Sequence, residues 1–117
     1  MSENLKNCLE ILKLISSVKS PILRRRLLTD YKDTDNVYNA LREISHNILK
    51  KNIKLTTGQQ KKLSKYSRII EKLAKKQKTK AARKKLLIQS GGFLPILIPT
   101  VISVLSEILR NGTFKQG

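Results

Sequence analysis

Positive charge is concentrated between residues 61 and 85. This stretch carries 12 of the 25 Lys and Arg residues of the 117-residue chain and one acid, Glu71. The 21 residues that follow, from Leu86 to Ser106, carry no charge, and the whole chain has a net charge of +17. Because like charges repel each other, this imbalance opposes compaction and favours binding to anions.

Apolar residues recur at helical spacing along the first 74 residues, and no segment alternates as a strand does. Ser20-Pro21 ends one predicted helix and begins the next, because proline suits a first helical turn. Thr56 and Gln59 form a capping box at the start of a fourth predicted helix. The four predicted apolar stripes are Leu5, Cys8, Leu9, Leu12 and Ile15; Ile22, Leu23, Leu27 and Leu28; Val37, Leu41, Ile44 and Ile48; and Leu63, Tyr66, Ile70 and Leu73.

These stripes predict an all-α fold, with a small bundle of about four short helices followed by a basic segment and an apolar C-terminal helix. The predicted parts are a helical bundle over residues 1–74, a basic linker that binds nucleic acid over residues 75–90, and a Gly-Gly site with a hydrophobic tail over residues 91–117. Pro99 is predicted to begin the last helix, since proline is favoured at the first helical position.

The charged stretch is the strongest functional signal. Each Lys or Arg can neutralise a phosphate and release a condensed counterion, and such contacts position a protein without reading base sequence. Aromatic residues make up only 4% of the chain, so stacking on bases is not the expected binding mode. The predicted nucleic-acid-binding residues are Lys61, Lys62, Lys65, Arg68, Lys72, Lys75, Lys76, Lys78, Lys80, Arg83, Lys84 and Lys85.

Other interpretations of the same charge stay open. A Lys-rich run is also typical of a solvated face or of a nuclear localisation signal. An anionic membrane surface would attract it as nucleic acid does. The third and fourth predicted helices, joined by residues 53–55, also fit helix-turn-helix DNA recognition, although most helical bundles contain such a pair. The density of the charge favours polyanion binding.

The uncharged stretch is near the length that spans a bilayer, but Gly91-Gly92, Pro95 and Pro99 interrupt it. A helix that contacts a membrane surface or a protein partner therefore fits better than an anchor. The glycine pair suits an extended protease cleft, but on local physics alone a loop between two helices is favoured. The predicted membrane- or partner-contacting residues are Phe93, Leu94, Ile96, Leu97, Ile98, Val101, Ile102 and Leu105.

Catalysis is not expected. The chain has one His and one Cys, and Cys8 lies on an apolar stripe. No metal-ligand cluster, phosphate-binding glycine loop or nucleophile motif is evident, so we expect a non-enzymatic protein without a metal or cofactor. A single cysteine excludes an intramolecular disulfide, and the charges of Lys6, Glu10 and Lys13 predict that no signal peptide is present.

The segment from Arg83 to Pro99, RKKLLIQSGGFLPILIP, resembles the precursors of adenovirus core protein X, also called Mu. Those precursors place a very basic segment before a Gly-Gly cleavage site and a Leu-Pro-rich tail. Together with residues 39–44 and the Lys-rich helix, the segment is also similar to small proteins of Polinton/Maverick elements and adintoviruses. This chain differs from Mu in its long helical region and in using Lys more than Arg.

The resemblance implies a virion core protein that condenses double-stranded DNA in the virion and the host nucleus. It also implies a viral cysteine protease of the adenain type as a partner. That protease would recognise Gln89, Gly91, Gly92 and Phe93, cut after Gly92 and release the tail. The alternative hypothesis is a membrane-active or capsid-tethering minor virion protein that acts through the apolar residues after Gly92.

Overall fold

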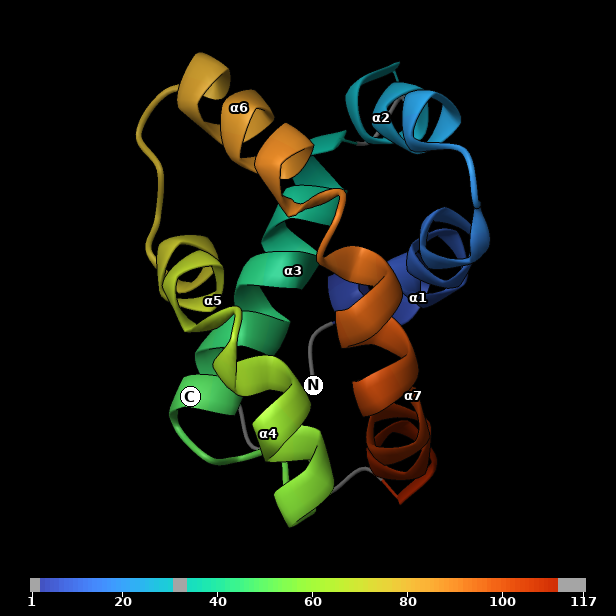
Figure 1. The fold of residues 1–117 in the computed structure, drawn as a ribbon, viewed down its shortest axis with the longest axis vertical. Helices are drawn as coiled ribbons and strands as arrows, with labels where there is room; N and C mark the ends of the chain where they lie inside the picture. Colours follow the sequence, from blue (N-terminus) through green and yellow to red (C-terminus); the bar gives the residue numbers. More distant parts are fainter. Residues whose placement is uncertain (1–2, 31–33, 112–117) are drawn as a thin grey trace.

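The computed structural model describes residues 3–30 and 34–111, and within these ranges the chain forms seven α-helices and no strand (Figure 1). The predicted all-α class is therefore confirmed. The helices are α1 (Glu3–Ser17), α2 (Pro21–Asp30), α3 (Thr34–Leu49), α4 (Thr57–Ser64), α5 (Ser67–Ala74), α6 (Lys80–Ser90) and α7 (Leu94–Asn111).

Helix α3 lies at the centre of the fold and packs against α1, α2, α5 and α6 (Figure 1). Helix α7 packs against α1 and α4. The stripes predicted for the first and third helices are confirmed, since every member is buried except Ile48, which is half-buried against the core. Residues from all seven helices join one hydrophobic cluster.

Local capping bonds explain where two of the helices begin. The Ser20 hydroxyl accepts a hydrogen bond from the backbone N–H of Leu23 at 3.3 Å, and α2 starts at Pro21 as predicted. The predicted capping box is also confirmed: Thr56 Oγ1 accepts from the N–H of Gln59 at 3.2 Å, and Gln59 Oε1 accepts from the N–H of Thr56 at 2.8 Å. These bonds satisfy backbone groups that a helix end otherwise leaves unpaired.

The predicted arrangement of about four helices followed by a basic segment is not confirmed. The expected fourth helix is two helices, because α4 packs on α7 whereas α5 packs on α3, and one straight helix could not meet both. Tyr66 lies at the break and places its ring against Phe93, with ring centroids 4.8 Å apart. Leu63 and Ile70, from either side of the break, are both buried in the core.

The segments predicted as basic linker and tail also contribute to the core. Residues 80–90 form α6, in which Leu86 and Leu87 are buried. Helix α7 begins at Leu94, so the prediction that Pro99 begins it is wrong. Pro95 lies in its first turn, where the missing N–H of proline leaves no gap in the hydrogen bonds, and Pro99 lies inside the helix.

The apolar face predicted for the second helix is only half right. Leu28 is buried and Leu27 packs against the core. Ile22 and Leu23 are 73% and 48% exposed. The physical reason is that only the C-terminal half of α2 reaches the core, so its first turn stands at the surface.

Candidate nucleic-acid interface

The predicted nucleic-acid-binding residues lie on α4, on the break between α4 and α5 (Lys65), on α5, on the connector of residues 75–79, and on α6. These elements follow one another along one side of the molecule in Figure 1, parallel to its longest dimension of 32 Å. Eleven of the twelve side chains are exposed, and Arg83 is half-buried. We call this row of elements, residues 61–85, the basic edge. Since one turn of B-DNA is about 34 Å long, the basic edge can follow about one turn of a duplex.

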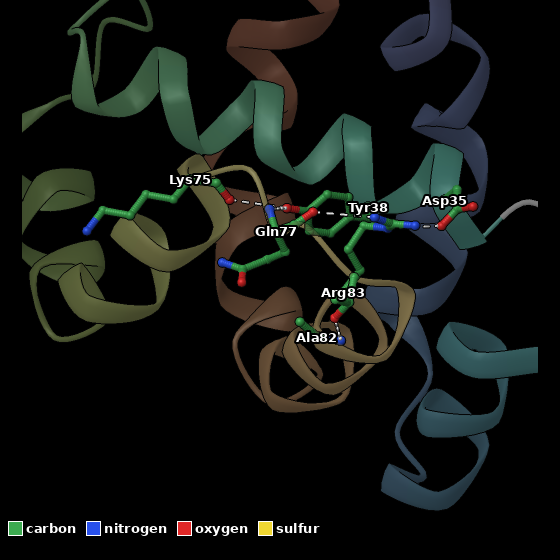
Figure 2. Close-up of polar contacts among 7 residues, drawn as sticks. Asp35, Tyr38, Lys75, Gln77, Ala82 and Arg83 are labelled. Carbon is green, nitrogen blue, oxygen red and sulfur yellow. Dashed lines mark hydrogen bonds and ion pairs between the residues drawn. The ribbon is translucent and has the colours of Figure 1, made fainter.

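The connector between α5 and α6 is fixed to α3 by Tyr38 (Figure 2). The Tyr38 hydroxyl donates a hydrogen bond to the Lys75 carbonyl at 3.2 Å and accepts one from the backbone N–H of Gln77 at 3.0 Å. The Tyr38 side chain is 1% exposed, so its ring is held by the core. Lys76 and Lys78 therefore extend from a fixed backbone, which lowers the entropy lost when an anion binds.

Arg83 joins α6 to the start of α3 (Figure 2). Its Nε lies 3.4 Å from Asp35 Oδ1, and its Nη1 donates a hydrogen bond to the Gln77 carbonyl at 3.3 Å. The side chain of Asp35 is 60% exposed, and exposed ion pairs contribute only about 0–1 kcal/mol. Arg83 therefore has a structural contact, but one that a stronger anion can replace.

Four residues of α3 that the sequence analysis did not identify as binding residues border this interface: Asp35, Tyr38, Asn39 and Arg42. Asp35 and Arg83 are 48 positions apart in the chain. No local motif connects positions so distant, and only the packing of α6 and the connector against α3 brings them together. Pairing of this kind could not be predicted from spacing or charge density.

The predicted cleavage site lies in the tight turn between α6 and α7. Gln89 and Gly92 are exposed, whereas Gly91 and Phe93 are buried. The Gly91 carbonyl accepts a hydrogen bond from Arg24 Nη1 at 3.3 Å, and the Phe93 N–H donates to the Ser90 carbonyl at 2.9 Å.

A Cβ on Gly91 would lie 3.3 Å from the Ile88 carbonyl oxygen, whereas one on Gly92 would meet nothing within 4 Å. Close packing thus explains why position 91 is a glycine, but it gives no reason for a glycine at position 92.

The predicted membrane- or partner-contacting residues are placed mainly in the core of this chain. Phe93, Leu94, Leu97, Ile98 and Val101 are at most 2% exposed. Ile96 and Ile102 are half-buried against the core, and Leu105 is outside the residues whose side chains the structure describes. Contact with a membrane or partner stays a prediction, and it requires the first half of α7 to leave the core.

No single helix in the described ranges is long and apolar enough to cross a membrane. Helix α6 and the first part of α7 reach that length and composition only as a pair, with a bend of 79° between them. Residues 3–30 and 34–111 also contain no group of three or more His, Cys, Asp or Glu side chains that could hold a metal ion.

Comparison with known proteins gives no match to a protein-family model, to a curated protein or to a solved structure. The functional interpretation therefore rests on the shape and charge of the basic edge.

Proposed function

We propose that this protein is a small, basic, non-enzymatic virion core protein that binds and condenses double-stranded DNA without sequence specificity. The observation that supports DNA binding is the exposure of eleven cations on consecutive elements from α4 to α6, and the resemblance of residues 83–99 to Mu precursors supports the virion role. A duplex carries one negative charge per about 1.7 Å of its axis, so flexible lysines can neutralise phosphates whatever the base sequence. Exposed cations outside the edge, such as Lys6, Lys19 and Lys54, leave positive charge for a second duplex.

Salt dependence tests this proposal. Fluorescence anisotropy with two labelled duplexes of unrelated sequence should give similar dissociation constants at about 50 mM salt. If roughly 6–10 phosphates are contacted, affinity should fall about 10³–10⁵-fold between 50 and 200 mM salt. Absence of duplex binding at the lower salt concentration, or strong preference for one sequence, would contradict the proposal.

The proposal includes release of the tail by an adenain-type cysteine protease that cuts after Gly92. The exposed, uncrowded position of Gly92 at a turn supports this step. A protease needs an extended substrate, however, and the bonds made by Gly91 and Phe93 hold this turn closed. Cleavage therefore requires local opening, and its rate should follow the free energy of that opening.

Incubation with such a protease should give a single cut before Phe93. Arg24→Ala should accelerate the cut, because it removes the hydrogen bond that Arg24 donates to the Gly91 carbonyl. Arg25→Ala is the matched control, since Arg25 is exposed and its loss changes the net charge equally. Mass spectrometry of timed samples measures both rates. An intact chain would refute the cleavage step, and equal rates for the two variants would refute its control by Arg24.

A further inference from the structure

A hollow of about 460 Å³ lies between α3 and the α5–α6 connector. Three cationic side chains line it, namely Arg42 from α3, Lys76 from the connector and Arg83 from α6, against one acid, Asp35. The hydrogen bonds of Tyr38 fix the connector wall, as Figure 2 shows. The hollow is therefore positive, partly enclosed and built on fixed backbone.

Arg42 lines this hollow and carries an unsatisfied polar group. Its Nε is buried and has no hydrogen-bond partner. Leaving a buried N–H without a partner is unfavourable. Arginine presents planar donors that match the oxygens of a phosphate, and it cannot lose its charge. An oxyanion in the hollow therefore suits the guanidinium of Arg42.

A second basic hollow, of about 270 Å³, lies on the other side of the Arg83–Asp35 ion pair and is lined by Lys80 and Lys84. Arg83 and Asp35 line both hollows. The ion pair thus separates two cationic cavities, and displacement of Asp35 would free Arg83 for a ligand in either. Two adjacent hollows that can each hold an anion suit a polymer of phosphates better than one small anion.

We propose that the hollow lined by Arg42, Lys76 and Arg83 is an anchoring site for a backbone phosphate of duplex DNA. The proposal rests on the proposed function and names where, along the basic edge, one phosphate is held by directed hydrogen bonds. Arg42 and Arg83 donate to the phosphate oxygens, and Lys76 adds charge at the rim. Asp35 is the internal competitor, because it occupies Arg83 when DNA is absent.

Charge-matched variants test the anchor. Arg42→Gln should weaken binding of a duplex about tenfold at 50 mM salt, whereas Arg68→Gln, an exposed arginine of α5 outside the hollow, should weaken it less than about threefold. Asp35→Asn should strengthen binding several-fold, and more than Glu71→Gln, which removes an exposed acid from the same edge. Equal effects within each pair would overturn the anchoring site.

A measurement on the unaltered chain guards against variants that fail to fold. In ¹H–¹⁵N NMR spectra of the arginine side chains, the Nε–H signal of Arg42 should shift on addition of a duplex of about one helical turn, and more than that of Arg68. An unchanged Arg42 signal during DNA binding would overturn the anchoring site and leave the proposed function standing. Absence of binding by the unaltered chain would overturn both.

Discussion

Replacing Lys75, Lys76, Lys78 and Lys80 with glutamate is expected to lower the affinity for duplex DNA more than about 10³-fold at 50 mM salt. The variant removes four cations near phosphates and adds four repulsive charges. The slope of log affinity against log salt should become less steep by about 3–4, since each lost contact removes about 0.9 from its magnitude. All four side chains are exposed, and the backbone contacts of the connector do not depend on them. Lys80 begins α6, where glutamate is favourable beside the helix dipole, so the fold should persist.

The matched control replaces Lys6, Lys19, Lys50 and Lys54 with glutamate. These side chains are exposed, lie outside residues 61–85 and change the net charge by the same amount. Their replacement should weaken binding much less, because they lie outside the elements that are proposed to contact the duplex. Anisotropy titrations at two salt concentrations compare the variants. Equal losses would show that net charge, and not the basic edge, determines DNA binding.

Leu97→Ala is expected to lower the free energy of unfolding by about 2–5 kcal/mol. Leu97 is 0% exposed in α7, which packs against α1 and α4. Small domains have only about 5–15 kcal/mol of stability, so this loss is a large fraction of the total. Urea denaturation followed by far-ultraviolet circular dichroism should show all helices unfolding together, because they share one core.

Ile22→Ala is the control for this core substitution. Ile22 is 73% exposed on α2, so its truncation should change stability by no more than about 0.5 kcal/mol. Separate melting of α7, with the rest of the chain unaffected by Leu97→Ala, would contradict a shared core. That result would instead support the prediction that residues 91–117 form a hydrophobic tail that folds separately from the helical bundle.

Periodicity predicted much of the fold because burial of a helix face imposes its spacing directly on the sequence. The α1 stripe from Leu5 to Ile15 and the α3 stripe from Val37 to Ile44 show this well. The break between α4 and α5 could not be predicted, because no glycine or proline marks Tyr66. It arises from packing against Phe93, a residue distant in sequence.

The candidate site was predicted in part. Charge density alone indicates which lysines are exposed, because a run of like charges must remain solvated. It does not indicate which of them share a cavity. Arg42 and Asp35 have no distinguishing local pattern, and their relation to Lys76 and Arg83 exists only after α6 packs against α3. The exposure of the lysines could be predicted from the sequence. Which residues share the hollow could be found only from the tertiary structure.

The packing of α1 against α7 has a consequence for biosynthesis. A ribosome adds about 5–20 residues per second, so the nascent chain waits about 4–15 s between completing α1 and beginning α7. During this interval the leucine face of α1 can pack against α3 but not yet against α7, while the emerging lysines can already attract RNA. The side of α1 that α7 covers therefore stays exposed until synthesis of the last helix, so the complete core can form only late in translation.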